Sequence, residues 1–303
     1  MDSPYSPLVS VGIPTYNRPE GLRRTLECIT GQTYKNLEII VSDNCSRNPD
    51  TEKVGREFAE KDSRVQYFRQ KENFGMGRNF EFVLEKAQGE YFMWAADDDE
   101  WNLMFIEECV KMIPLNGSAC TYFNVIRRYN STIQSFSLPD ISADYPCYIN
   151  IKNFLLNMQS PMFCGLHTRK SILWVIGQEK FDFFDCYFIF RILCHNEFSI
   201  SKKELLSQGS DSPNGNKPFN PSTKYLFQYS PFFKNCTRTL IHSKLNYFEK
   251  IKIQFLLIWI TLNLYCIYEK DYHPKKLKII QGCIKLTKST YITNLGRRFI
   301  KNM

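Results

Sequence analysis

The stretch Val9–Asp43, VSVGIPTYNRPEGLRRTLECITGQTYKNLEIIVSD, decides the fold class of this chain. Both of its ends are apolar runs, and a helical pattern lies between them. In that helix Leu22, Leu26 and Ile29 fall on one face. Pro19 occupies the first turn, where its missing N–H costs no hydrogen bond. The second apolar run is nearly continuous, as in a strand that is buried on both sides. A strand, a helix and a strand in this order predict a parallel pair covered by helices.

The alternation of strands and helices continues through the first third of the chain. The pattern predicts strands at Val9–Ile13, Leu37–Ser42, Arg64–Arg69 and Tyr91–Ala96, and helices at Pro19–Ile29, Thr51–Glu60, Met76–Ala87 and Met104–Met112. The next section is less regular, with a strand expected at Cys120–Tyr129, a helix at Phe183–Cys194 and a loop at Ser207–Ser222. We therefore expect an α/β fold with a Rossmann-like, mostly parallel sheet and helices on both faces. Residues 1–115 and 116–210 would form its two halves, and residues 211–303 a helical, basic C-terminal region.

The formal net charge of +8 is confined to the C-terminal end. Residues 270–303 contain nine Lys and Arg side chains and one acidic side chain, whereas the rest of the chain is balanced. A nucleic-acid-binding surface would spread its basic residues over the folded face, so we expect no nucleic acid partner. A local basic segment favours peripheral contact with an anionic membrane, such as the inner membrane face. A solvated helix packed on the body of the protein fits the same segment equally well.

Three further features bound the class of protein. The apolar stretch Phe255–Tyr268 is shorter than the roughly 20 residues that span a bilayer, so it is either a buried core helix or a membrane-surface helix. The eleven cysteines form no C-x-x-C pair and the four histidines stand apart, which indicates reduced thiols and no zinc site. The first residues lack the pattern of a secretory leader. Together these features predict a cytoplasmic protein.

Polar, turn-forming residues follow each of the four expected strands of the first half. These groups are Pro14-Thr15-Tyr16-Asn17-Arg18, Asp43-Asn44, Asn73-Phe74-Gly75 and Asp97-Asp98-Asp99. In a parallel sheet the carboxyl ends of all strands lie on one edge, which is where ligands bind. The second group alone fits an Asx turn and the third alone fits a helix entry. All four at one edge favour a single binding site.

The triplet Asp97, Asp98 and Asp99 directly follows an apolar run, so its carboxylates repel one another beside a low-dielectric sheet edge. A solvated acidic turn is the simpler interpretation. A hard divalent cation, Mg²⁺ or Mn²⁺, would neutralise the cluster and keep open positions for phosphate oxygens. The chain has neither a P-loop nor a G-x-G-x-x-G sequence, so we expect phosphates to be held through the metal.

Two stretches, VSVGIPTYNRPEGLRRTLECITGQTYKNLEIIVSDNCS and NFGMGRNFEFVLEKAQGEYFMWAADDDEW, resemble the inverting family 2 glycosyltransferases of bacterial surface-polysaccharide synthesis, which have the GT-A fold. The resemblance covers about the first 115 residues closely, and a weaker similarity on the acceptor side runs from Gly165 to Asp185. It implies that a sugar is transferred, with inversion, from a nucleotide-diphosphate donor, expected to be a UDP-sugar. The implied acceptor is a glycan or lipid-linked saccharide of O-antigen or capsule.

Transferred residue by residue, the resemblance implies a nucleotide-sugar pocket. The residues expected to bind the donor are Pro14, Thr15, Tyr16, Arg18, Asp43, Asn44, Asn73, Asn79, Asp97 and Asp98. Of these, Asp43 would hydrogen-bond the base, and Asn73 and Asn79 would shape the wall near the ribose and phosphates. Within the D-x-D segment, Asp98 or Asp99 would contact the metal. The register is open, because many relatives carry an acid where this chain has Ala96.

The resemblance also implies a general base at the start of an acceptor-side helix. Asp185 fits this position and Asp182 is the second choice, although either residue also fits an ordinary helix N-cap. Many relatives supply a third metal ligand from a later histidine, whereas Ser207–Asn216 contains none. Two other functions remain open, a sugar nucleotidyltransferase and an inactive nucleotide-sugar-binding protein. The first typically has a glycine-rich phosphate loop, which Gly12-Ile13-Pro14 is not.

Overall fold

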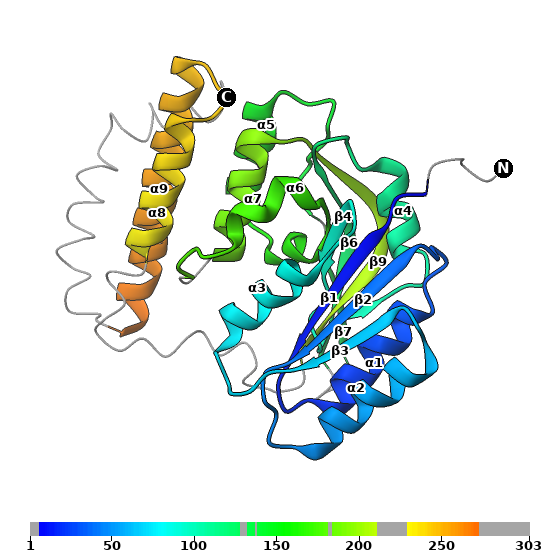
Figure 1. Cartoon of the computed structure of the whole chain (residues 1–303). Helices are drawn as coiled ribbons and strands as arrows, with labels where there is room; N and C mark the ends of the chain where they lie inside the picture. The colour runs from blue at the N-terminus through cyan, green and yellow to red at the C-terminus, as the bar shows by residue number, and fades with distance from the viewer. Residues whose placement is uncertain (1–5, 128–131, 137, 181–183, 211–228, 273–303) are drawn as a thin grey trace.

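The computed structural model describes residues 6–127, 132–136, 138–180, 184–210 and 229–272 (Figure 1). The strands are β1 (Val9–Thr15), β2 (Leu37–Asp43), β3 (Val65–Arg69), β4 (Tyr91–Trp94), β5 (Glu100–Trp101), β6 (Ser118–Arg127), β7 (Thr132–Phe136), β8 (Leu166–Thr168) and β9 (Phe198–Ser210). The α-helices are α1 (Pro19–Thr30), α2 (Pro49–Lys61), α3 (Met76–Lys86), α4 (Phe105–Met112), α5 (Cys147–Leu156), α6 (Arg169–Ile172), α7 (Phe184–His195), α8 (Tyr229–Ile241) and α9 (Tyr247–Tyr272). Two short 3-10 helices are η1 (Ser160–Cys164) and η2 (Leu173–Val175).

The described strands form one sheet in the order β3-β2-β1-β4-β8-β6-β9-β5, with β7 beside β6. Strands β1 to β4 are parallel, and their register sets Thr15 opposite Asp43 and Gly12 opposite Trp94. The polar segments that follow these strands therefore leave the sheet at the same edge. Strand β8 runs antiparallel to both of its neighbours, so the parallel order holds for the first half and the whole sheet is mixed. The expected α/β class is confirmed.

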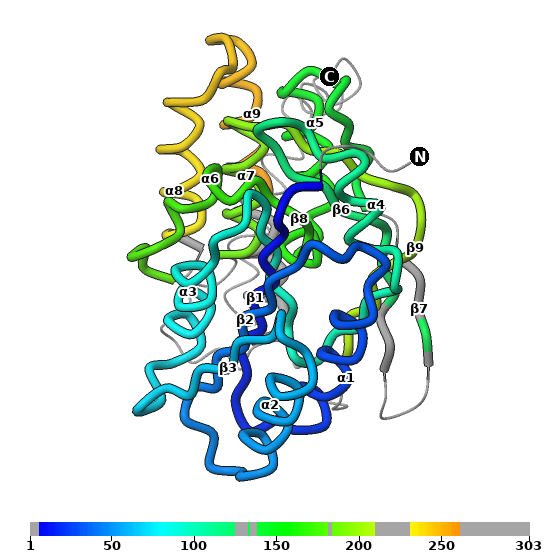
Figure 2. The backbone as a smooth tube through the Cα atoms, turned by 45° about the vertical axis from the view of Figure 1, so that its right-hand side comes forward, coloured from blue at the N-terminus to red at the C-terminus, as the bar shows by residue number. Residues whose placement is uncertain are grey.

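Helices α1 and α2 lie on one face of the parallel strands and α3 lies on the other (Figures 1 and 2). Strand β1 is buried along its whole length, as its apolar sequence requires. Gly12 permits the close contact with α3, because a Cβ there would fall 2.6 Å from Val83 Cγ2. The site edge is therefore held by a strand that is covered on both faces.

The second half departs from the sequence prediction in several places. The loop expected at Ser207–Ser222 is wrong for its first residues, because β9 continues to Ser210 and pairs in parallel with β6. Backbone pairing overrides the turn-forming composition there, and residues 211–222 lie outside the described part of the chain. Helix α5 and strand β8 were not expected, since neither has a strong period in the sequence.

The C-terminal helices α8 and α9 form a layer on α5 and α7 (Figure 1). The apolar stretch from Phe255 is helical, and up to Ile260 it is partly rather than fully buried. Leu257 is completely buried, whereas Phe255 is 61% exposed. Within the described residues no helix combines the length and apolar character needed to cross a bilayer.

Candidate functional site

A pocket of about 340 Å³ opens at the edge where the parallel strands end. Its walls are Pro14, Thr15, Tyr16, Arg18, Asn44, Asn73, Met76, Asn79, Phe80, Ala96, Asp97 and Asp98. Nine of these twelve residues are among those expected from the sequence to bind the donor, and they come from all four polar segments. The structure therefore brings the four segments to one cavity. The binding role of each residue remains a prediction.

Buried side chains join the first polar segment of the wall to the acidic triplet. Thr15 Oγ1 donates a 2.7 Å hydrogen bond to Asp97 Oδ2, which links the end of β1 to the acidic triplet. Gly21 in the first turn of α1 lies against the same loop, and a Cβ there would fall 2.0 Å from the carbonyl oxygen of Asp97. Thr25 on the next turn donates to the carbonyl oxygens of Ala96 and Asp99. Helix α1 thus fixes the backbone of the triplet.

The carboxylates of Asp97 and Asp98 face the pocket and share a cation. One guanidinium nitrogen of Arg18 lies 2.7 Å from Asp98 Oδ2 and 3.3 Å from Asp97 Oδ1. Burial raises the pKa of Asp97 to about 6, and the hydrogen bond from Thr15 and the charge of Arg18 partly offset this effect. The deepest carboxylate of the pocket therefore titrates close to neutral pH.

The third carboxylate of the triplet, Asp99, does not line the pocket. It is 5% exposed, and its Oδ1 accepts a 2.9 Å hydrogen bond from the backbone N–H of Gly209 in β9. Its Oδ2 lies 3.9 Å from the Cys164 sulfur. Asp99 therefore ties the triplet to the second half of the sheet, and its assignment as a metal ligand remains a prediction.

The donor set facing the pocket fits a hard divalent cation. Asp97 and Asp98 offer carboxylate oxygens, the ligands that Mg²⁺ and Mn²⁺ prefer, beside a cavity that can admit phosphate oxygens. The described residues contain no group of three or more His, Cys, Asp or Glu that could hold a metal by themselves. A metal at this site would thus take part of its coordination from a bound ligand and from water.

Three asparagines build the opposite wall. Asn79 is 4% exposed; its amide accepts from Ser42 Oγ at 2.6 Å and donates to the backbone oxygens of Ser42 and Thr15. Asn44 Nδ2 donates to Asn73 Oδ1 at 2.9 Å. These bonds join α3 and the turn before it to the ends of β1 and β2. They hold the wall in one shape before any ligand binds.

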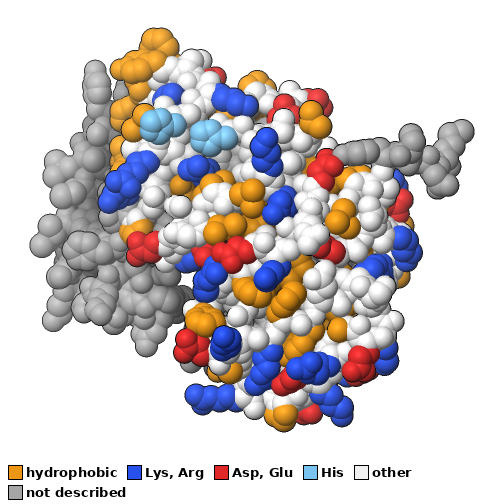
Figure 3. Space-filling model, in the orientation of Figure 1, with side chains coloured by type: hydrophobic (Ala, Val, Ile, Leu, Met, Phe, Trp, Pro, Cys, Tyr) orange, Lys and Arg blue, Asp and Glu red, His pale blue; other side chains and the backbone are white. Residues whose placement is uncertain are grey.

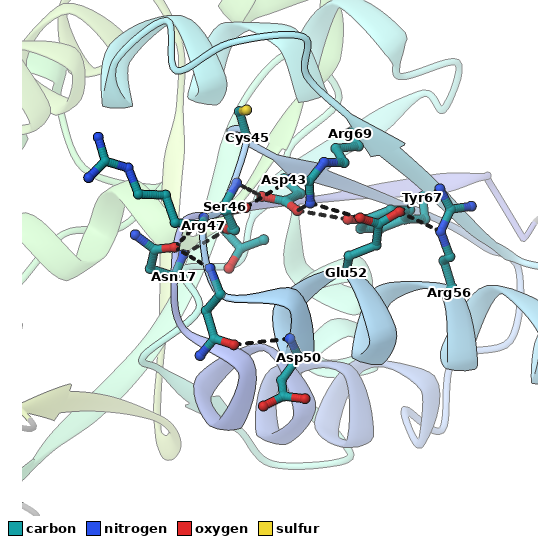
Figure 4. A network of polar contacts seen from close by, with 12 residues as sticks. Asn17, Asp43, Cys45, Ser46, Arg47, Asp50, Glu52, Arg56, Tyr67 and Arg69 are labelled. Atoms are coloured by element: carbon teal, nitrogen blue, oxygen red, sulfur yellow. Dashed lines mark hydrogen bonds and ion pairs between the residues drawn. The ribbon is translucent and has the colours of Figure 1, made fainter.

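Asp43, expected to contact the base, is completely buried and does not line the pocket. Its Oδ1 accepts from the N–H of Ser46 at 2.8 Å, and its Oδ2 accepts from the Tyr67 hydroxyl at 2.8 Å and from Arg69 at 3.3 Å. Figure 4 shows these groups converging on Asp43, with Glu52 on the far side of Arg69. Protein donors therefore engage both carboxylate oxygens of Asp43.

The candidate base Asp185 lies at the start of α7, where its Oδ1 accepts from the N–H of Cys186 at 2.8 Å. Burial raises its pKa. Burial raises the pKa of the nearby Cys164 thiol, and the charges of Asp99, Asp98 and Asp185 add to this effect. Asp182, the second choice, lies outside the described residues.

Several residues of the site were missed at the level of sequence. Met76 and Phe80 line the pocket from α3, yet apolar residues at helical spacing are typical of a core. Gly21 and Thr25 act through close contact and hydrogen bonds that only the packed structure reveals. Asn17 has a left-handed backbone (φ 56°), and its side chain accepts from the N–H groups of Arg47 and Asn48. The sequence pattern placed Asn17 in the first polar group, but not among the residues expected to bind the donor.

Comparison with known proteins finds that the family model Glycosyl transferase family 2 matches residues 10–177. The chain is 39% identical over 95 residues to a Campylobacter jejuni GalNAc(5)-diNAcBac-PP-undecaprenol beta-1,3-glucosyltransferase, an alignment that covers 31% of this chain and 30% of that protein. The chain spans about a third or less of the length of the curated relatives it matches.

Two groups of solved structures share the fold. TarS 1–349 of S. aureus in complex with UDP-GlcNAc matches with a TM-score of 0.64 and 16% identity, over 84% of this chain and 72% of that one. A Pyrobaculum calidifontis mannosyltransferase in complex with GDP-Man and Mn²⁺ matches with a TM-score of 0.52 and 15% identity, over 98% of this chain and 85% of that one. At such low identity these similarities show the fold alone, and that fold is GT-A.

Proposed function

This chain belongs to glycosyl transferase family 2, and we propose that it transfers a sugar from a nucleotide-diphosphate donor to a hydroxyl group of a glycan. The observation that carries the proposal is the pocket at the carboxyl edge of β1, β2 and β4, in which polar segments from four separate parts of the chain meet. A nucleotide sugar combines a base, a ribose, two phosphates and a sugar. It needs such an extended polar site rather than a single motif.

We propose a UDP-sugar as the donor. A protein of the same fold, TarS, has been solved with UDP-GlcNAc, which supports a uridine nucleotide here. Tyr16 and Asn44 line the cavity beside Asn73 and would hold the base and ribose, and Arg18 would meet the diphosphate. Asp43 would keep the loop that follows β2 in place.

We propose Mg²⁺ or Mn²⁺ as the cofactor, held by Asp98 with Asp97 or Asp99 beside it. A bound divalent ion would stabilise the negative charge that develops on the departing diphosphate. The neighbour solved with GDP-Man and Mn²⁺ supports this choice of metal. The two carboxylates and Arg18 would orient the donor so that its anomeric carbon faces the acceptor side.

For the acceptor side we propose a single displacement with inversion, in which Asp185 removes the proton from the acceptor hydroxyl. Its burial at the start of α7 supports a base that is tuned toward neutral pH. The Campylobacter relative, named for transfer onto a saccharide carried on PP-undecaprenol, supports a lipid-linked acceptor, and we propose one of the O-antigen or capsule kind. Such an acceptor would place the protein at the inner membrane face.

The decisive experiment measures the nucleotide released from UDP-, dTDP-, GDP- and CDP-sugars, with and without EDTA. We expect release from one of them, most strongly from a UDP-sugar, and a loss of at least about 100-fold on chelation or in Asp98→Asn. Asp50→Asn, a carboxylate at the start of α2 outside the pocket, is the matched control and should retain activity. Donor binding without any release would indicate the inactive binding protein instead.

A further inference from the structure

The turn between α8 and α9 carries an exposed apolar cluster that the proposed reaction does not use. Ile241 is 60% exposed, Tyr247 is 72% exposed and Phe248 is 75% exposed. The two aromatic rings contact each other, with centroids 5.8 Å apart. We call these three residues the tip patch. Large aromatic side chains with this exposure, side by side, are typical of an interaction surface.

Basic side chains surround the tip patch. His242 and Lys244 are exposed between its members in sequence. Burial lowers the pKa of His195 at the end of α7, and the positive charges of Arg191, Lys244 and His242 add to this effect, so these basic residues lie near one another. Figure 3 shows histidine, Lys and Arg side chains gathered below an apolar cap at the upper left of the molecule. The nearby acid, Glu249, is engaged by the N–H of Asn246.

Aromatic side chains flanked by basic ones match the chemistry of an anionic bilayer, with apolar groups at the acyl boundary and cations at the phosphates. To bind this patch, a protein partner would need a complementary acidic groove. An anionic lipid surface binds any protein that presents exposed apolar side chains with basic side chains beside them.

We propose that the tip patch docks this protein on the surface of an anionic lipid bilayer. The proposal rests on the proposed function for its purpose, because a lipid-linked acceptor is presented at such a surface. It also fixes a distance. Asp185 and His195 lie at opposite ends of α7, about 15 Å apart at 1.5 Å per residue, and the tip patch lies at the His195 end. The candidate base therefore lies about the length of α7 away from the end of that helix nearest the tip patch.

Flotation of the full-length protein with lipid vesicles tests the docking surface without any catalytic step. We expect it to float with vesicles that contain phosphatidylglycerol and to remain in the dense fraction with phosphatidylcholine alone. Tyr247→Ser/Phe248→Ser should lower the vesicle-bound fraction at least about tenfold, because two exposed aromatic rings lose their burial in the bilayer. Lys244→Glu should also lower the vesicle-bound fraction, and the decrease should be larger at low salt than at high salt.

The matched control is Leu115→Ser/Ile133→Ser, which removes two apolar side chains that are 80% and 68% exposed elsewhere. It should float like the wild type. Equal flotation of the tip variant and the wild type would overturn the proposal, as would a wild type that ignores anionic vesicles. A wild type that is a dimer and does not bind vesicles, together with a tip variant that is a monomer, would also overturn the proposal. Donor binding, measured in parallel, separates these results from a failure of the proposed reaction.

Discussion

The guanidinium group of Arg18 lies 2.7 Å from the carboxylate of Asp98, so a side-chain cation sits on the segment expected to bind metal. The same nitrogen lies 3.3 Å from Asp97. Two carboxylates at the pocket wall therefore share one positive charge, which offsets the repulsion between them. A divalent ion that approaches these oxygens competes with Arg18.

Arg18→Ala should tighten the binding of Mn²⁺ to the nucleotide-free protein and weaken the binding of UDP in the presence of Mn²⁺. Removing the competing cation frees the carboxylates, while the diphosphate loses a donor. Because Arg18 is half-exposed, we expect changes of about threefold to tenfold in each dissociation constant. Titration calorimetry measures both. Arg23→Ala, in which a residue of α1 loses its ion pair with Glu57 of α2, should change neither. Equal Mn²⁺ affinity in Arg18→Ala and the wild type would contradict the competition.

Asp43→Asn should weaken the binding of UDP, CDP and GDP by a similar factor. Its oxygens accept from Ser46, Tyr67 and Arg69, so the substitution disturbs the loop after β2 and not a base-reading group. We expect a loss of about tenfold in affinity, together with a loss of stability of about 2 kcal/mol, because an amide offers these buried donors one acceptor oxygen where the carboxylate offers two. Glu52→Gln, which alters a neighbouring partner of Arg69, should be milder. A change in preference among the three bases would instead assign Asp43 to base recognition.

Asp185→Asn should bind donor as the wild type does and transfer sugar at least about 100-fold more slowly. A base acts only when deprotonated, and burial raises the pKa of Asp185. The rate of the wild type should therefore rise with pH over a range above that of an exposed carboxyl group, which titrates near 3.9. Single-turnover rates at saturating donor, measured across this pH range, report the rise. Asp144→Asn, at an exposed carboxylate, should leave it unchanged, and a wild-type rate in Asp185→Asn would exclude the base role.

Most of the first half of this fold is readable from sequence because it is built from local patterns. The buried strand β1 and the amphipathic helix α1 can each be predicted from the hydrophobic pattern within their own residues. The parallel order then follows from their alternation, and with it the common edge at which the polar segments meet. This chain of reasoning needs no knowledge of which side chains touch.

The rest depends on contacts between distant segments. The pairing of β9 with β6 and β5, and the bond from Gly209 to Asp99, join residues about a hundred positions apart. Nothing in the triplet Asp97 to Asp99 indicates which carboxylate turns away from the pocket. The same holds for Asp43, whose partners Tyr67 and Arg69 come from the next strand. Sequence identifies the polar groups, and packing decides which of them remain available to a ligand.

Gly21→Ala should impair both stability and donor binding, although Gly21 does not line the pocket. The added Cβ would fall 2.0 Å from the carbonyl oxygen of Asp97, so α1 and the acidic loop must move apart. We expect a loss of about 1–3 kcal/mol in the free energy of unfolding and a weaker affinity for UDP. Gly31→Ala, at the residue that follows α1, is the control, since a Cβ there would have its nearest contact at 3.0 Å. Denaturant melts and UDP titrations measure both effects; normal UDP affinity in Gly21→Ala would show that the loop tolerates the shift.

His167 should make the folded protein sensitive to mild acid. It is completely buried on β8, with Nε2 3.1 Å from the carbonyl oxygen of Phe163 and Nδ1 2.7 Å from Ser118 Oγ. Since a carbonyl only accepts, Nε2 carries the proton and the neutral ring accepts from Ser118. Burial lowers the pKa of His167 from 6.5 to about 4.

Above pH 6.5 the imidazole of His167 is neutral in both the folded and the unfolded chain. As the pH falls from 6.5 to about 4, the unfolded chain binds a proton that the folded chain excludes, so stability declines, by about 3 kcal/mol in all. Denaturant melts across this range measure the decline. In His167→Gln the slope should flatten even if the variant is less stable at every pH, whereas His242→Gln, at an exposed histidine, should keep the wild-type slope. An unchanged slope in His167→Gln would assign the acid sensitivity to other groups.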